Sequence, residues 1–203
     1  MIKSAISIFN LVWNDASNSG SRFKRICISF LYQIYKRIPF AKPFHVELVS
    51  GYKYIVRPNV PNSTGIIYSR IYESNAIDIA RTVLSNRDSG TIIDIGAHTG
   101  LYSLQLADLS SKIILIEPSN ETAKVLHENI NINHQIDAEI HEVAIGNYIG
   151  KATLYSNQKF DGMASLNSSN IKEKGDTVNI VTLDSIIFDK TISFLKIDCE
   201  GAE

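Results

Sequence analysis

The order of apolar and polar positions divides the chain into an α/β region and a preceding extension. From Thr91 onward, apolar runs typical of buried strands alternate with segments of helical spacing. This alternation predicts a parallel sheet with right-handed crossovers. Its expected strands are 92–95, 113–117, 138–143 and 192–197, with helices at 101–108 and 119–132. Two further strands are expected at 151–155 and 177–181, on either side of a polar loop at 156–176.

The first part of the chain has a different pattern. Helical spacing predicts mainly helix in residues 1–42, and two apolar runs around Ser50-Gly51, at 45–49 and 52–56, predict a β-hairpin. Residues 59–64 are expected to form a loop and 75–85 a helix. The predicted organisation is therefore an extension of helices and a hairpin at 1–72 and an α/β domain at 73–203.

One apolar stripe in the extension has two interpretations. It consists of Phe23, Ile26, Cys27, Phe30, Leu31, Ile34, Tyr35 and Ile38, with basic residues beside it and no acidic residue between them. In the first interpretation, the helix packs its stripe on the main domain and keeps its charges in solvent. In the second, residues 22–38 make a peripheral contact with an anionic membrane surface.

Composition narrows the class of protein. With 203 residues and 44% hydrophobic residues, the chain is long enough to bury a core as one domain plus an extension. A net charge of −1 argues against a general nucleic-acid binder. Cys27 and Cys199 lie far apart in apolar contexts, so we expect buried free thiols in a reducing compartment. No apolar run approaches the roughly twenty residues of a membrane span, and we expect a cytoplasmic protein.

The clearest candidate site is the turn after the first core strand. The segment Asp94-Ile95-Gly96-Ala97-His98-Thr99-Gly100 joins a strand to a helix, as in a nucleotide-binding βαβ unit. Its two glycines permit backbone conformations and a close ligand approach that a Cβ would block. The following helix offers free N–H groups at its N-terminus. Glu117, at the end of the next strand, is placed to accept both hydroxyls of a ribose.

The spacing of this turn distinguishes between ligands. A dinucleotide fingerprint has the form G-x-G-x-x-G, whereas here His98 stands where the second glycine would be. Without that glycine, the backbone cannot approach a pyrophosphate as closely. Asp94, just before the first glycine of the turn, suits a ligand with a cationic ammonium group. S-adenosylmethionine has a ribose, an ammonium group and no phosphate, so the pattern favours it over NAD.

Several motifs together resemble the FkbM-type methyltransferases, which are S-adenosylmethionine-dependent and mainly O-methylating. The similarity extends from about residue 73 to the end of the chain. The matching segments are Ile93–Gly100, Ile116-Glu117-Pro118, Val143-Ala144-Ile145-Gly146, Thr182-Leu183-Asp184 and Leu195–Glu203. The resemblance implies a Rossmann-like class I methyltransferase sheet in which Gly96 and Gly100 shape the donor pocket and Asp94 faces the methionine end.

The sequence departs from this family in two places. His98 stands where the family usually has Asn, and either a polar cofactor contact or a helix-capping role would suit it. Family members also continue with further strands that complete a seven-stranded sheet. The sequence stops just after the fourth strand, so we expect a sheet that is incomplete at the C-terminus and, as a hypothesis, a truncated enzyme.

Two carboxylates after the last strand are candidates for catalysis. Asp198 and Glu200 could accept a proton from a substrate hydroxyl, and Asp198 could instead hold the donor's ammonium group. Both could also be helix N-terminal charges. We expect no metal, because no His or third carboxylate follows at a metal-ligand spacing. The predicted reaction is methyl transfer to a hydroxyl of a sugar or secondary metabolite, the alternatives being an NAD-binding oxidoreductase and a non-catalytic remnant.

Overall fold

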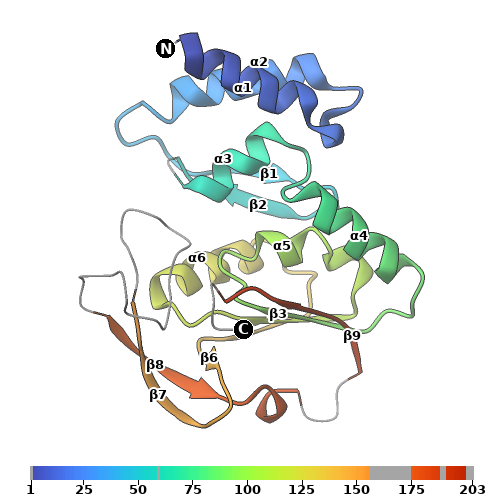
Figure 1. The fold of residues 1–203 in the computed structure, drawn as a ribbon, viewed down its shortest axis with the longest axis vertical. Helices are drawn as coiled ribbons and strands as arrows, with labels where there is room; N and C mark the ends of the chain where they lie inside the picture. Colours follow the sequence, from blue (N-terminus) through green and yellow to red (C-terminus); the bar gives the residue numbers. More distant parts are fainter. Residues whose placement is uncertain (1, 59, 156–174, 188–190, 200–203) are drawn as a thin grey trace.

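The computed structural model describes residues 2–58, 60–155, 175–187 and 191–199. A parallel four-stranded sheet forms the centre of an α/β fold, with the N-terminal helices at one end and a small three-stranded sheet at the other (Figure 1). The β1–β2 hairpin lies between the N-terminal helices and the helices that cover the central sheet. The predicted fold class, a Rossmann-like α/β sheet preceded by helices and a hairpin, is confirmed.

The helices and strands follow the predicted order with small shifts at their ends. The α-helices are α1 (Ile2–Asn14), α2 (Arg22–Tyr35), α3 (Pro61–Tyr68), α4 (Ser74–Ser85), α5 (Leu101–Leu104) and α6 (Asn120–Asn131). Short 3₁₀ turns are η1 (Ala16–Asn18), η2 (Ala107–Leu109) and η3 (Leu183–Ser185). The strands are β1 (Phe44–Glu47), β2 (Lys53–Val56), β3 (Thr91–Ile95), β4 (Lys112–Ile116), β5 (Ala138–His141), β6 (Ala144–Ile145), β7 (Gly150–Leu154), β8 (Asp176–Val181) and β9 (Ile192–Ile197).

The central sheet has the strand order β5-β4-β3-β9, and every neighbouring pair is parallel. Within this sheet, the chain first forms β3 and then adds β4 and β5 on one side of it. It later returns to add β9 on the other side of β3. This reversal makes the carboxyl edge of β3 the position where such sheets bind ligands. Ile95 pairs with both Ile116 and Ile197, so the three strands end at the same level.

Successive side chains of β3 and β4 point to opposite faces of the sheet, and both faces are buried. On one face, Ile92, Ile113 and Leu115 pack with apolar residues of α4 and with Leu126 of α6. On the other face, Ile93 belongs to a cluster with residues from the segment before β6 and from η3. Both faces are therefore covered, which explains why the strands read as continuous apolar runs.

A second core joins the extension to the α/β domain. Tyr54 of the hairpin and Ile66 of α3 are buried together with Leu101 and Leu104 of α5. The predicted loop at 59–64 is wrong, because α3 begins at Pro61. A proline is tolerated in the first turn of a helix, where its missing N–H is not needed. The division of the chain at residues 72 and 73 stays a prediction.

The apolar stripe of α2 is covered only in part. Phe23 is 74% exposed, Leu31 65% and Ile34 63%, whereas Tyr35 packs against the cluster that contains Leu101 and Leu104 of α5. The helix contacts α1 and α3 with its other side. The first interpretation is therefore wrong for the outer part of the stripe, which stays exposed. Helical spacing identifies an apolar face but does not say whether the rest of the fold covers it.

The cysteines are also less buried than expected. Cys27 is exposed on the outward side of α2 and Cys199 is partly buried, and the two form no disulfide bond. The expectation of buried thiols is therefore wrong for Cys27, because the apolar face that carries it points away from the core. Among the helices that the structure describes, none is long and apolar enough to cross a membrane.

The remaining strands form a separate sheet, which lies below the central one in Figure 1. The predicted strands at 151–155 and 177–181 correspond to β7 and β8, which pair antiparallel, and β6 adds to β8 in parallel. Gly146 continues this contact by donating from its N–H to the carbonyl oxygen of Val181. Most of the predicted polar loop between β7 and β8 lies outside the described residues.

Candidate functional site

The ends of β3, β4 and β9 bring the predicted site residues together. Gly96, Glu117 and Asp198 each follow the last paired residue of their strand, and these last residues pair with one another. The Gly96 N–H donates to the carbonyl oxygen of Ile116 at 3.0 Å, and the Asp198 N–H donates to that of Ile95, also at 3.0 Å. Two acidic side chains and the glycine turn therefore share one edge of the sheet.

The two glycines are required by the turn itself. Gly96 has a φ of +74°, and a Cβ there would lie 2.0 Å from the carbonyl oxygen of Asp198. Gly100 has a φ of +78°, and its Cβ would lie 2.6 Å from a methyl carbon of Leu126 on α6. Since only glycine combines this backbone conformation with so close a contact, Gly96 allows the turn to lie directly on the end of β9.

Glu117 is held firmly and retains accepting capacity. Its Oε2 accepts a hydrogen bond from the His98 N–H and its Oε1 accepts one from the Ser119 N–H, each at 2.9 Å. Burial raises the pKa of this carboxyl, and the two backbone hydrogen bonds oppose the shift. Each carboxylate oxygen can accept more than one hydrogen bond, so Glu117 can still receive two ligand hydroxyls.

Asp94 is engaged inside the protein. It is fully buried; its Oδ2 accepts from the Ser103 hydroxyl at 2.7 Å and its Oδ1 from the Lys196 ammonium at 3.0 Å. The cation that the sequence leads one to expect beside Asp94 is therefore supplied, in this structure, by the chain itself. A ligand ammonium group would have to compete with Lys196 for this carboxylate.

Lys196 is the residue that sequence reasoning missed. Its Nζ also donates to the carbonyl oxygen of Gly96 at 3.1 Å and lies 3.6 Å from a carboxylate oxygen of Asp198. Burial favours a lower pKa for this ammonium, but the Asp94 carboxylate outweighs burial and raises the pKa above its ordinary value. A signal was present, because Lys196 is the one charged residue in the apolar run Ile192–Ile197.

The sequence that forms this edge of the sheet identifies the family of the chain. The family described as "Methyltransferase FkbM domain" matches residues 94–203, which is more than half of the chain. The chain belongs to the FkbM methyltransferase family. The match begins at Asp94 and includes the glycine turn, Glu117 and the strand that carries Lys196 and Asp198.

Solved structures of other methyltransferases are similar to part of this FkbM chain. An S-adenosylmethionine-dependent methyltransferase from Agrobacterium tumefaciens is 12% identical, with a TM-score of 0.39, and the match covers 51% of this chain and 33% of that one. A putative RNA methyltransferase from Pyrococcus horikoshii is 18% identical, with a TM-score of 0.30 and coverage of 59% and 50%. The C-terminal domain of precorrin-6Y C5,15-methyltransferase from Rhodobacter capsulatus is 18% identical, with a TM-score of 0.28 and coverage of 38% and 50%.

The matched parts span at most half of each of these structures. A comparison with curated protein sequences gave no match.

His98 connects the glycine turn of the FkbM domain to the extension. It has a φ of +50°, and its Nδ1 lies 3.0 Å from the amide nitrogen of Asn62 on α3. The N-cap residue of α5 is Gly100, which has no side chain to cap the helix. The sequence could not indicate the Asn62 contact, since residues 59–64 read as a loop.

Asn129 joins α6 to the same turn from another side. Its amide group donates to the carbonyl oxygen of Thr99 at 2.8 Å and accepts from the Ile55 N–H at 2.9 Å. Tyr54 adds a hydrogen bond between its hydroxyl and that of Thr99, at 2.9 Å. The hairpin and α6 therefore hold the glycine turn in place through buried polar contacts.

The predicted catalytic pair is only half described. The Asp198 side chain is 58% exposed, so it can reach a ligand at the sheet edge. Glu200 lies outside the described residues. Among the described residues, no group of three or more His, Cys, Asp or Glu side chains is placed to hold a metal ion.

The site residues suit S-adenosylmethionine by the chemistry of their side chains. Glu117 has acceptor oxygens at the strand next to the glycine turn, where ribose hydroxyls would donate. Asp198 offers an exposed carboxylate on the other side of Gly96, which could pair with an ammonium group. The two carboxylates thus offer acceptors on either side of the glycine turn, independently of the buried Asp94.

Proposed function

We propose that this chain carries the donor-binding part of an S-adenosylmethionine-dependent O-methyltransferase. The observation that supports the proposal most is the shared level of Gly96, Glu117 and Asp198 at the carboxyl edge of a parallel sheet in an FkbM domain. Because the chain spans half or less of the methyltransferase structures that it resembles, its activity and acceptor are part of the proposal.

Donor binding in this proposal relies on two carboxylates and a rigid turn. Glu117 accepts the two ribose hydroxyls, and the backbone N–H groups that it already binds keep it in place. Asp198 pairs with the ammonium group of the donor, and the Lys196 ammonium, 3.6 Å away, helps to hold this carboxylate in position. Bound S-adenosylmethionine would supply a methyl group that its sulfonium has already activated.

The acceptor in this proposal is a hydroxyl group of a sugar or another small metabolite. The protein then has to align the acceptor oxygen, and such positioning can lower a barrier by several kcal/mol, up to about 7–11 in ideal systems. A carboxylate that takes the hydroxyl proton adds about 10²–10⁴-fold. Asp198, whose side chain is 58% exposed, is our first candidate for this base and Glu200 the second. The base role of Asp198 is an alternative to its pairing with the donor's ammonium group.

Isothermal titration of the chain with S-adenosylhomocysteine tests the donor site. We expect binding by the unmodified chain, its loss in Glu117→Ala, and unchanged binding in Asp88→Ala. Asp88 is exposed and lies just before β3, at the opposite edge of the sheet, so its removal leaves the donor edge intact. Equal affinity in all three proteins would refute the assigned site, and binding of NADH instead would favour an oxidoreductase.

A cytoplasmic location completes the proposal. Cys27 and Cys199 form no disulfide bond, which is the usual state of cysteines in a reducing compartment. The exposed position of Cys27 makes this argument stronger than burial would, because an exposed thiol in an oxidising compartment would react.

A further inference from the structure

The outward face of α2 is apolar along its length. Phe23, Leu31 and Ile34 are each more than 60% exposed, and Ile38, just beyond the helix, is 52% exposed. Nine of the sixteen exposed large apolar side chains among the described residues lie in the first 44 residues. Exposed apolar residues on a monomer are usually scattered, and a concentration of this kind indicates a contact surface.

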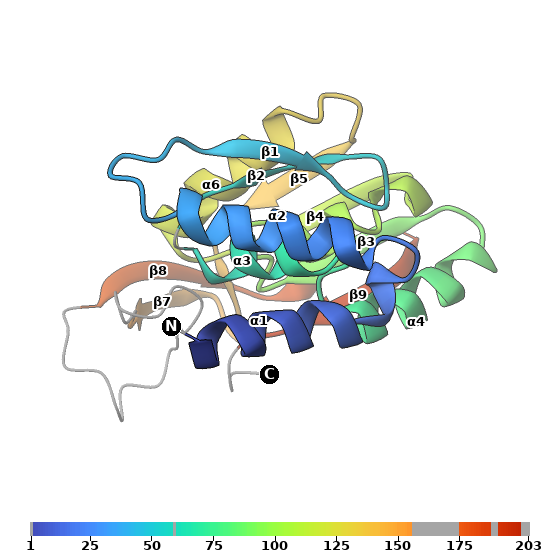
Figure 2. The same ribbon diagram turned by 90° about the horizontal axis from the view of Figure 1, so that it is seen from above.

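Helix α1 extends this surface with an aromatic cluster. The Trp13 ring stacks on Phe9 with centroids 5.4 Å apart and meets the edge of Phe23, from α2, at 5.4 Å. The Arg22 guanidinium lies 5.6 Å from the centre of the Trp13 ring. Figure 2 views the molecule from this end and shows α1 and α2 in front of the other elements. Aromatic rings beside cations are typical of the interface between hydrocarbon and water.

The first 44 residues are predominantly basic. Residues 1–44 contain seven Lys or Arg and a single acidic residue, Asp15, whereas the other 159 residues contain 13 basic and 20 acidic residues. Lys24 and Arg37 are exposed on either side of the apolar stripe. A cationic, apolar end on a chain with a net charge of −1 attracts an anionic surface selectively.

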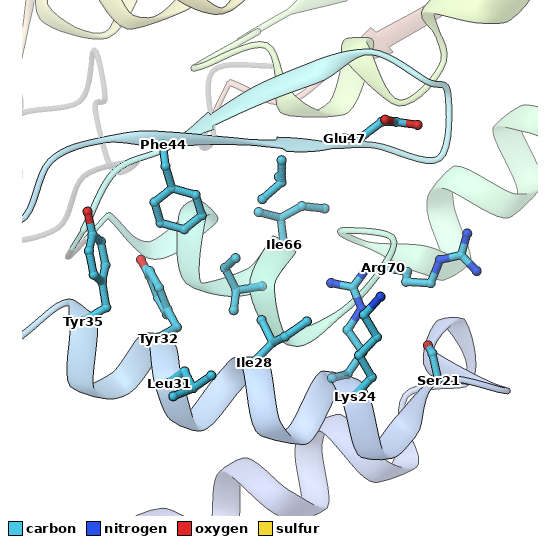
Figure 3. Close-up of a pocket in the computed structure, with 13 residues that line it drawn as sticks. Ser21, Lys24, Ile28, Leu31, Tyr32, Tyr35, Phe44, Glu47, Ile66 and Arg70 are labelled. Atoms are coloured by element: carbon cyan, nitrogen blue, oxygen red, sulfur yellow. The ribbon is translucent and has the colours of Figure 1, made fainter.

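A pocket beside the stripe also combines apolar and cationic residues. It has a volume of about 670 Å³ between α2, α3 and β1, and Leu31 and Lys24 belong both to its lining and to the exposed side of α2 (Figure 3). Tyr32, Tyr35 and Phe44 form its apolar end, and Lys24 and Arg70 lie at the other (Figure 3). Arg25 and the acidic Glu47 also line the pocket. Burial and the neighbouring Arg70 lower the pKa of Arg25. An anionic headgroup at this end would relieve the repulsion between the two arginines.

We propose that α1 and the outward face of α2 dock on an anionic lipid bilayer. The apolar stripe enters the boundary between headgroups and hydrocarbon, and the flanking cations contact the lipid phosphates. A second copy of the chain fits this face less well. A symmetric dimer through α2 would place the same cations opposite one another, where they repel.

Vesicle co-sedimentation of the 203-residue chain tests this proposal. We expect binding to vesicles of phosphatidylcholine mixed with phosphatidylglycerol, and no binding to phosphatidylcholine alone. The binding should weaken as salt is added, because the charge contribution is screened. Failure to bind the anionic vesicles, or equal binding to both kinds, would overturn the proposal.

Matched variants separate the apolar and the charge contributions. Phe23→Ser should weaken partitioning roughly tenfold, as expected for the loss of one buried aromatic side chain. Ile79→Ser, which removes a side chain 67% exposed on α4, should change nothing. Lys24→Glu and Arg37→Glu should each weaken binding roughly fivefold or more, whereas Lys151→Glu, at an exposed position on β7, should not.

Two further readouts make the test decisive. Circular dichroism checks that each variant keeps the fold, and the exposed positions of Lys24 and Arg37 make their variants the safest. Analytical ultracentrifugation detects self-association. A dimer that dissociates in Phe23→Ser, with no vesicle binding by the unmodified chain, would show that a second copy covers this face. Because none of these residues touches the donor site, failure here leaves the proposed methyltransferase function intact.

Discussion

Lys196 on β9 donates hydrogen bonds to Asp94 on β3 at 3.0 Å and to the carbonyl oxygen of Gly96 at 3.1 Å. One ammonium group thus neutralises the buried carboxylate at the base of the glycine turn and holds the turn itself. The centre of the Tyr102 ring lies 5.5 Å from this ammonium group, at the distance of a cation–π contact. The pair couples the two strands whose ends carry the donor site.

Removing Lys196 should therefore destabilise the fold strongly. In Lys196→Met, Asp94 remains buried without its cation, and breaking such a pair costs about 3–5 kcal/mol in the free energy of unfolding. Urea denaturation measures this loss. The double variant Asp94→Asn with Lys196→Met should lose less than the sum of the single variants, because the uncompensated charge is gone.

Lys112 provides the matched control for this prediction. It pairs with Glu139 across two strands, but both side chains are about one-third exposed, so Lys112→Met should have a much smaller effect. Equal losses from the two lysine variants would contradict the role given to Lys196.

Gly96→Ala should disrupt the contact between the turn and β9. Its Cβ would lie 2.0 Å from the Asp198 carbonyl oxygen, which belongs to the backbone and cannot move without shifting the strand end. Gly51 has a similar φ of +81°, but its Cβ would meet nothing within 4 Å. Gly51→Ala should therefore cost only about 1–2 kcal/mol for the left-handed conformation. Gly96→Ala should cost clearly more in urea denaturation, and similar values would show that the close contact is unimportant.

The pH dependence of stability should report on Glu117. Burial raises its pKa in the folded state above that in the unfolded chain, so the folded state binds the proton more tightly. The free energy of unfolding should then fall as the pH rises from the unfolded-state pKa through the folded-state pKa.

Glu117→Gln should lack this part of the decline. Burial also raises the pKa of Asp94, and this carboxylate remains in both proteins, so the difference between the two profiles reports Glu117 together with its repulsion by Asp94. Urea denaturation at a series of pH values measures the two profiles. Parallel profiles for the unmodified chain and Glu117→Gln would rule out the raised pKa.

Asn129→Ala should weaken both stability and donor binding. The variant leaves the Ile55 N–H and the Thr99 carbonyl oxygen without their buried partner, and each such group costs about 1–3 kcal/mol. Because Thr99 belongs to the glycine turn, affinity for S-adenosylhomocysteine should fall as well. Asn120→Ala, at the exposed first residue of α6, is the control. A loss of stability with unchanged affinity would separate Asn129 from the donor site.

The periodicity of the chain was sufficient to predict the central sheet. Strands buried on both faces appear as apolar runs, so β3 and β4 could be recognised without tertiary information. The apolar run of β9 was recognised in the same way, although Ile192, Leu195 and Ile197 are partly exposed in the structure. Their parallel order also determined that Gly96, Glu117 and Asp198 would meet, because parallel strands end at one edge. Local pattern and topology were enough for this part of the site.

The partners inside the site depended on the tertiary structure. That Asp94 pairs with Lys196, 102 residues away, and that His98 contacts Asn62 on α3 follow from packing between distant segments. The sequence near each residue does not indicate which distant segment will pack against it. The start of α3 was missed for the same reason, since burial of Ile66 against the hairpin outweighs the loop-like composition around Pro61.

The sequence by itself determined that α2 has an apolar stripe and cationic neighbours. Only the tertiary structure decided that this stripe faces outward, with Phe23 74% exposed and Tyr32 buried on the other side. The physical reason is that periodicity reports which residues share a face of a helix, whereas burial depends on which face the neighbouring helices α1 and α3 occupy.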